Sequence, residues 1–442
     1  MMAFRPVVDL GGNNSGKPVN RNLISTLAFI LGIQLLGFSY FLWFLSQHGY
    51  LPSPFFYYKH EVLMDLFRPL YWSDNGGAYT VWRSFYPPLN FLFLKFIKQI
   101  FLGSTVFSDS FALRASAFPV VLFFIFSYLV SPILVLRTRL WNCFTNAEKI
   151  LLYFIVILST PMLFELERGN LIIYTLFFIP FVLSSTGMLR MFCIAILINL
   201  KPYLALLLIF YIARRNWKEF WLCTLITGIL FVITGILQDP NYWLIFANMF
   251  TFSQIGASLS LKEVMAMPSS MAAYSYVFNN EIIQHTKYGY FFNLHVFANA
   301  IYAINWFVLA WVIAAIYNKQ DRLNDAQIFA ILLVIVSNLG VWVGGWSLIF
   351  YVTLLPVFLT MRFGKIYLVI LILLFVPLDF IPLVKVTIGE QYSYLTDSIV
   401  VVHWTLGMGS VLKPILNFML MATLLYETRQ LRRQDMACKS IT

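Results

Sequence analysis

The sequence has little charge and few cysteines. Only 11% of its 442 residues are Asp, Glu, Lys or Arg, whereas soluble domains carry about 25%. No two of its four cysteines form a CxxC pair, so the sequence predicts neither a disulfide framework nor a metal site. The scarcity of charge, together with a 60% share of hydrophobic residues, excludes an ordinary soluble enzyme.

The sequence contains many long runs of apolar residues. Many approach about 20 residues, the length that an α-helix needs to cross about 30 Å of hydrocarbon. They do not alternate apolar and polar residues as the strands of a membrane β-barrel do. We therefore expect an all-α polytopic membrane protein with about 12 transmembrane helices. The expected spans are 23–46, 113–136, 149–164, 171–185, 188–200, 203–213, 219–238, 298–317, 326–344, 347–361, 366–384 and 409–426.

Basic residues outnumber acidic ones, giving a net charge of +11, but they do not form a nucleic-acid surface. They lie in short clusters between the apolar runs, as the positive-inside rule predicts for cytoplasmic segments. The alternation of these clusters places both termini in the cytoplasm. It also places the cysteines on or near that side, where thiols stay reduced; these are Cys143, Cys193, Cys223 and Cys438. The abundance of Phe, Asn, Lys and Tyr favours a bacterial cytoplasmic membrane.

A single transmembrane domain is expected over 23–426, with cytoplasmic tails at 1–22 and 427–442. The first tail is polar and shows no cleavable signal peptide, so we expect the first span to stay as an anchor. Two long segments are predicted on the outer side of the membrane, 47–112 and 239–297.

The first outer segment contains a short apolar stretch that is not expected to span. Residues 91–102 read FLFLKFIKQIFL, with Lys95 and Lys98 on one helical face. This pattern predicts an amphipathic helix in the membrane interface, with both lysines toward the lipid headgroups. Pro87-Pro88 suits the first turn of that helix.

Two aspartates of this segment differ in their surroundings. Asp74 belongs to the sequence Asp-Asn-Gly-Gly, which favours a solvated turn, and a supporting role in substrate binding is the alternative. Asp65 lies in HEVLMDLFRPLYW, where apolar and aromatic neighbours remove part of its hydration. Asp65 is therefore the candidate general base.

Four polar side chains interrupt the apolar pattern in ELERGN, residues 165–170. A simple turn would explain them. The functional alternative is an anion site, because an arginine can hold a phosphate through a forked pair of hydrogen bonds. Arg168 is then the candidate phosphate ligand, and Glu165, Glu167 and Asn170 are supporting residues.

Three more residues are candidates on the outer side. Lys201 precedes a proline inside an apolar stretch, and because an ammonium at the bilayer centre is costly, we expect two short helices that meet there. Lys201 either contacts a phosphate or reaches the membrane interface. Arg114 begins the second span and contacts either a lipid headgroup or the same phosphate. Trp346 is either an interfacial aromatic residue or a face on which a sugar stacks.

These motifs together resemble the GT-C glycosyltransferases, and most closely glycosyltransferase family 87, whose members use polyprenyl-phosphate sugars. The resemblance covers about residues 60 to 360, and its motifs occur in the family's order. They are Asp65 with Tyr86-Pro87-Pro88, Glu167-Arg168-Gly169-Asn170, Lys201-Pro202, and Gly345-Trp346-Ser347, the last without the family's histidine.

The resemblance implies a GT-C fold and a hexose transfer, with inversion, from a polyprenyl phosphate to an acceptor hydroxyl on the outer face of the membrane. The acceptor would be a glycolipid or a cell-envelope polysaccharide. Asp65 would accept the hydroxyl proton, while Arg168, Lys201 and Arg114 would stabilise the departing phosphate. The supporting or substrate-binding residues would be Asp74, Tyr86, Glu165, Glu167, Asn170 and Trp346. No cofactor is implied, and the resemblance leaves the use of a divalent metal ion undecided. The expected partners are donor, acceptor and membrane lipids, and no nucleic acid.

Two other classes of membrane protein stay open. A flippase or transporter of lipid-linked sugars would place ionisable groups in mid-membrane and often show repeated halves, whereas here the ionisable groups gather at one predicted face. An O-antigen polymerase or ligase is expected to use arginines of a large late outer loop. The 239–297 segment contains no arginine.

Overall fold

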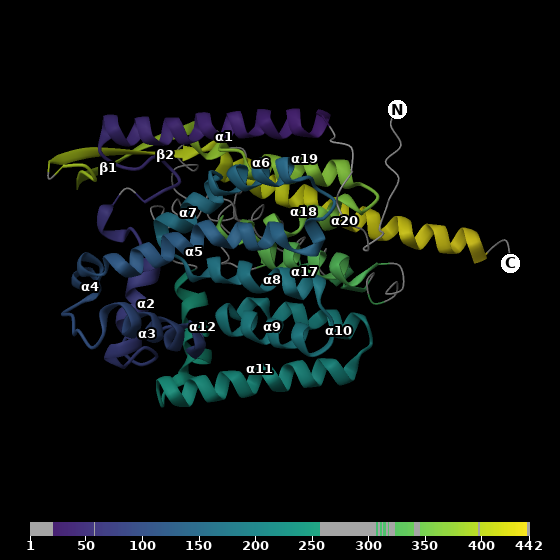
Figure 1. The fold of residues 1–442 in the computed structure, drawn as a ribbon, viewed down its shortest axis with the longest axis horizontal. Coiled ribbons are helices and arrows are strands. Elements are labelled where there is room, and N and C mark those ends of the chain that lie inside the picture. The colour runs from purple at the N-terminus through teal and green to yellow at the C-terminus, as the bar shows by residue number, and fades with distance from the viewer. Residues whose placement is uncertain are drawn as a thin grey trace.

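A computed structural model describes residues 21–56, 58–256, 323–339, 345–396 and 398–439, and isolated positions between 306 and 317. The described chain is mostly helical, and several of its helices run side by side in a similar direction (Figure 1). They include α1 (Arg21–His48), α5 (Phe118–Arg137), α8 (Thr175–Ser184), α9 (Gly187–Leu200) and α11 (Trp217–Gln238). Their buried side chains belong to one apolar core that extends from Leu27 to Leu424.

Three helices of the described part are long and apolar enough to cross a membrane: Leu23–His48, Phe118–Arg137 and Trp217–Gln238. A fourth candidate is the pair α6 (Asn146–Ile157) and α7 (Thr160–Arg168), which meet at a bend of 53°. Large apolar side chains on these helices are exposed, among them Leu36, Phe126 and Ile236. Such helices indicate a membrane protein.

The described residues do not confirm the predicted number of about 12 spans. Several expected spans are apolar helices of only 10–17 residues, α8 and α9 among them. Interruptions explain their length; α9, for example, ends before Lys201-Pro202, and a proline cannot continue the hydrogen bonding of a helix. The expected span at 298–317 and most of the 239–297 segment lie outside the described residues.

The remaining helices are mostly short. In the first outer segment they are η1 (Lys59–Glu61), α2 (Met64–Asn75), α3 (Pro88–Leu102) and α4 (Ser110–Ser116). Further along the chain are η3 (Leu171–Tyr174), η4 (Pro202–Leu208), α10 (Ile209–Ala213), α12 (Ile245–Gly256), α17 (Asp325–Leu339), η6 (Gly345–Thr353), α18 (Leu355–Leu359), α19 (Gly364–Phe375), η7 (Leu378–Phe380) and α20 (Met408–Lys439). Because α20 continues to Lys439, the helix predicted to end at 426 is longer than expected.

A β-hairpin corrects the all-α prediction. Strands β1 (Pro382–Tyr392) and β2 (Ile399–Gly407) pair in antiparallel fashion. They occupy the end of the expected span 366–384 and the segment between it and the expected span 409–426, which the alternation of the spans assigns to an outer loop. Both strands are rich in Val, Ile and Thr, whose branched side chains favour the extended backbone. In Figure 1 the hairpin, α2, α3 and α4 gather at the left-hand end of the helices, and α10 lies at the right-hand end.

Helix α3 confirms one prediction and corrects another. It begins at Pro88, which occupies its first turn as expected. Lys95 is exposed, but Lys98 is buried and its ammonium donates a hydrogen bond to the carboxylate of Asp74. The prediction that both lysines face the headgroups is therefore wrong for Lys98, because Asp74 on the packed helix α2 supplies a counter-ion.

Candidate active site

A close contact between the end of α7 and the start of α2 builds the site. Gly169 ends α7 with a φ of 69°, a left-handed conformation that favours glycine. A Cβ at this position would lie 2.9 Å from the Cβ of Leu66 and 3.1 Å from the Cα of Leu63. The amide of Leu63 also donates to the carbonyl of Glu167, at 2.7 Å. Glycine therefore allows the residues around it to reach the first turn of α2.

Asp65 lies in that first turn and is bound by the residues on both sides of Gly169. Arg168 Nη2 donates to Asp65 Oδ1 at 2.5 Å, and Asn170 Nδ2 donates to Asp65 Oδ2 at 3.0 Å. The side chain of Asp65 is 18% exposed, whereas that of Arg168 is 8% exposed. The carboxylate is therefore held by buried donors and remains accessible from outside.

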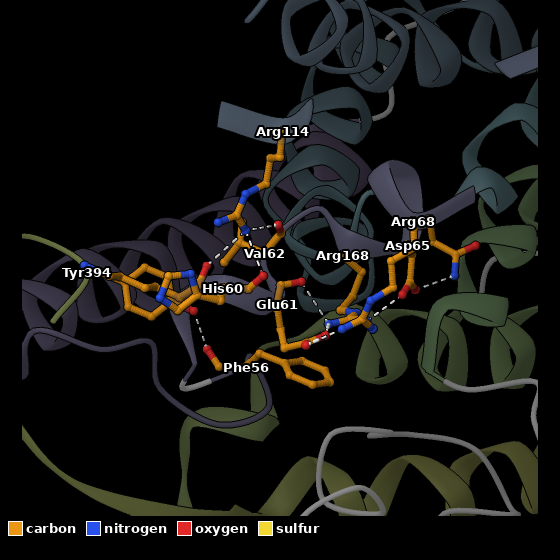
Figure 2. Close-up of polar contacts among 11 residues, drawn as sticks. Phe56, His60, Glu61, Val62, Asp65, Arg68, Arg114, Arg168 and Tyr394 are labelled. Carbon is orange, nitrogen blue, oxygen red and sulfur yellow. Dashed lines mark hydrogen bonds and ion pairs between the residues drawn. The ribbon is translucent and has the colours of Figure 1, made fainter. Parts of the chain in front are cut away.

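Phe56 and Glu61 also contact the Arg168 guanidinium (Figure 2). Its Cζ lies 3.9 Å from the centre of the Phe56 ring, a cation–π arrangement. Its Nη1 donates to the main-chain carbonyl of Glu61 at 3.2 Å, and the Glu61 carboxylate lies 3.9 Å away. Glu61 in turn pairs with Arg68 at 2.5 Å. These contacts hold the planar donor group of Arg168 in one orientation.

Lys201 joins the same network through Asn170. Its buried Nζ donates to Asn170 Oδ1 at 2.9 Å and lies 4.8 Å from the centre of the Tyr86 ring. Burial lowers the pKa of the Lys201 ammonium to about 8, and the negative charges of Glu165 and Asp65 oppose this shift. Asn170 therefore connects the carboxylate of Asp65 to a second cation.

The end of α9 places Lys201. Asn90, in the first turn of α3, donates through Nδ2 to the carbonyls of Asn199 and Leu200, at 3.1 Å each. These carbonyls at the helix end have no partner within the helix, so a side-chain donor satisfies them. The contact fixes the backbone just before Lys201.

Three more predicted residues lie at this site. Glu165 is fully buried, and neither of its carboxylate oxygens has a hydrogen bond in the described part of the chain. Glu167 is also buried, one residue before Arg168. Tyr86 is close enough to Asp65, Arg168 and Glu165 to interact with them electrostatically. Burial raises the pKa of its hydroxyl. We call Asp65, Arg168, Asn170, Lys201 and Glu165 the Asp65 cluster.

The other predicted residues are placed elsewhere or are not described. Arg114 Nη1 donates to the carbonyls of Lys59, His60 and Val62, at 3.2, 2.9 and 2.8 Å, so it braces the segment before α2 (Figure 2). Asp74 lies nine residues beyond Asp65 on α2, about 13 Å along the helix axis. Segment η6, which begins at Gly345, packs against α7, but the side chain of Trp346 is outside the described residues.

Sequence reasoning missed the residues that support Arg168. Phe56 and Glu61 precede Asp65 without a local pattern that marks them. Tyr394, from the turn of the β-hairpin, donates through its hydroxyl to the carbonyl of Phe56 at 2.7 Å. Because this contact joins segments 338 residues apart, no short motif reports it.

No protein-family model, curated protein or solved structure matches the chain. Among the described residues, no group of three or more His, Cys, Asp or Glu side chains is arranged to hold a metal ion. The site consists of a partly accessible carboxylate beside a guanidinium, with an ammonium connected through Asn170.

Proposed function

We propose that the protein transfers a hexose from a polyprenyl-phosphate donor to a hydroxyl of a glycolipid or cell-envelope polysaccharide, with inversion, on the outer side of a bacterial cytoplasmic membrane. The observation that carries the proposal is the position of the Asp65 carboxylate. It lies beside Arg168 and one amide away from Lys201, and these two cations come from separate segments of an apolar helical chain.

In this reaction Asp65 accepts the proton of the acceptor hydroxyl while the hydroxyl oxygen forms a bond to the anomeric carbon. The bond from that carbon to the phosphate oxygen breaks, and the electron pair leaves with the polyprenyl phosphate. A general base must reach the proton it removes, and the 18% exposure of the Asp65 side chain provides that access.

The leaving phosphate gains negative charge as the bond breaks, so fixed cations lower the barrier. Arg168 offers a planar fork that suits phosphate oxygens, and its stacking on Phe56 holds the fork in place. Lys201, with a pKa of about 8, carries its charge at neutral pH. Apolar helix surfaces supply a place for the polyprenyl tail.

The segments at the two ends of the helices support the predicted orientation of the protein in the membrane. The hairpin and α2 lie at one end in Figure 1, and α10, which Arg214-Arg215 follows, lies at the other. The positive-inside rule assigns such an arginine pair to the cytoplasm. The Asp65 cluster is then on the outer side, as the proposal requires.

The experiment is a transfer assay with the full chain in nanodiscs, polyprenyl-phosphate glucose or mannose as donor, and bacterial glycolipids as acceptors. Wild type should form a glycosidic bond of inverted configuration. Asp65→Asn should lower the transfer rate by about 10³-fold, the scale of general-base catalysis, and change donor affinity by less than about threefold.

Asp74→Asn is the matched control, since this aspartate lies on the same helix but pairs with Lys98. It should retain the transfer rate. Near-normal transfer by Asp65→Asn would exclude Asp65 as the base. Movement of the donor between leaflets without formation of a glycosidic bond would exclude the transferase and favour a flippase.

A further inference from the structure

Three buried polar groups in or next to the Asp65 cluster lack hydrogen-bond partners in the described part of the chain: the carboxyl oxygens of Glu165 and of Glu167 on α7, and the hydroxyl of Tyr203 on η4. The Glu167 carboxyl lies beside the backbone of Phe56, whereas Glu165 and Tyr203 lie near each other. Burying a polar group without a partner is costly, and most such groups are satisfied in folded proteins. Glu165 and Tyr203 therefore point to a ligand that supplies the missing hydrogen bonds.

Both groups lie next to the proposed phosphate contact. The Glu165 carboxylate is near enough to interact electrostatically with Lys201, Asp65 and Arg168. Tyr203 is near enough to interact with Glu165 and Tyr86. Yet no ion pair joins Glu165 to Lys201 or Arg168 among the described residues, so their charged atoms are separated by more than contact distance. A polar atom of a ligand, or of water, can bridge such a separation.

We propose that Glu165 and Tyr203 bind ring hydroxyl groups of the donor sugar while Lys201 holds the adjacent phosphate. This inference rests on the proposed function and names the part of the donor that these residues recognise. A carboxylate accepts two hydrogen bonds side by side, which matches the two donors of neighbouring sugar hydroxyls. Tyr203 can donate to, or accept from, a further hydroxyl.

The chemistry favours a hydroxylated ring over other occupants. An apolar group would leave Glu165 and Tyr203 unsatisfied, whereas the hydroxyl groups of a sugar can both donate to and accept from them. The Tyr86 ring, which already contacts the Lys201 ammonium, offers an aromatic face beside the same space. A site built to bind hydroxyls discriminates strongly against ligands that lack them.

The test compares two lipids of equal charge, polyprenyl-phosphate glucose and methyl polyprenyl phosphate, binding to the full chain in nanodiscs. Wild type should bind the sugar-bearing lipid at least about tenfold more tightly. Glu165→Gln and Tyr203→Phe should each reduce this preference to less than about threefold. Both variants should bind the methyl ester within about twofold of wild type.

Tyr211→Phe is the control, because the buried hydroxyl of Tyr211 on α10 also lacks a partner in the described part but lies near Arg190 and Asp325. It should keep the full preference for the sugar-bearing lipid. Thermal unfolding of each variant identifies any loss of fold, and the smaller Tyr203→Phe change provides the test if Glu165→Gln does not fold.

Three results would overturn the sugar subsite. The first is an equal loss of affinity for both lipids in Glu165→Gln, which would mean that Glu165 affects phosphate binding through the charge of Lys201. The second is an unchanged preference in both variants. The third is equal affinity of the wild type for the methyl ester and for the sugar-bearing lipid. This result would overturn the sugar subsite but not the phosphate site. A wild type that binds neither lipid would overturn the proposed function together with the subsite.

Discussion

Two charge clusters at opposite ends of the helices differ in how completely they are paired. At the α10 end, Arg190 binds Asp325 Oδ2 at 2.7 Å and Arg214 binds Asp325 Oδ1 at 2.8 Å. The Arg190 guanidinium also lies near the rings of Phe210 and Phe329, at 5.1 and 5.3 Å. We call this the Asp325 cluster. Each oxygen of its carboxylate has its own arginine, so it connects α9, α17 and the end of α10.

The Asp65 cluster is paired less completely. Asp65 has two donors, but the buried Glu165 beside it has none in the described part of the chain. Buried charges alone therefore do not distinguish a reactive site from a structural connection. The distinction lies in the carboxyl groups: both oxygens of Asp325 are bound by arginines, whereas both oxygens of the buried Glu165 lack a partner in the described part of the chain.

The largest difference between the clusters should appear when their arginines are replaced by lysine. Arg168→Lys keeps the charge but loses the planar fork and the stacking on Phe56, so transfer should fall by about 10²-fold or more. Arg214→Lys should leave the rate per folded molecule within about twofold. Initial rates of sugar transfer measure both. Equal losses would show that the two clusters do not differ in function.

The second difference is a pH dependence confined to the Asp65 cluster. The pKa of Lys201 is about 8, so its ammonium loses its proton as the pH rises through that value. Donor affinity should fall about tenfold per pH unit above it, since the phosphodiester of the donor keeps its charge there. Glu165, Asp65 and Tyr86 are the titratable groups that face Lys201.

Lys201→Arg isolates this effect, because a guanidinium stays protonated over the whole range. The variant should bind the donor with an affinity that is flat between about pH 7 and 9. Donor titrations at several pH values measure the profile. A wild-type profile without a decrease above pH 8, or the same decrease in the variant, would contradict the assignment of Lys201 as a phosphate contact.

The smallest effect on transfer is expected from Asp325→Asn. It should lower the free energy of unfolding by about 1–3 kcal/mol, because the buried Arg190 loses a charged partner. The 38% exposure of the Asp325 side chain places the effect toward the lower value. Chemical unfolding measures the change. The transfer rate per folded molecule should stay within about twofold, and a larger decrease would link this cluster to the reaction.

Local sequence features predict the helices and the candidate site residues, but they predict the contacts between distant segments less well. Apolar runs indicate the membrane helices, and the order of short motifs selects Asp65, Arg168, Asn170 and Lys201, which the structure brings together. Their roles in transfer stay predictions. The hairpin was missed because most of its residues lie between two expected spans and were interpreted as an outer loop; the pairing of β1 with β2 is a contact between two segments that no single local pattern contains.

Long-range partners account for the other differences. Lys98 has the spacing of an interfacial lysine, and only its contact with Asp74 from a different helix reverses that prediction. Arg114 donates through Nη1 to three carbonyls more than 50 residues earlier in the chain, contacts that the sequence pattern did not predict, and its role as a phosphate ligand stays a prediction. Such choices depend on which acceptor lies closest in space, a quantity that the sequence pattern does not contain.

Gly169 also limits when the site can form during synthesis. Asp65 is made 103 residues before Arg168, and both of its donors flank the glycine that lets α7 approach α2. Until α7 leaves the ribosome, the carboxylate has neither donor, although α2 can already pack against α3 and α4. Completion of the Asp65 contacts must therefore wait for a helix that follows the second candidate span, even though the acidic residue itself emerges just after the first.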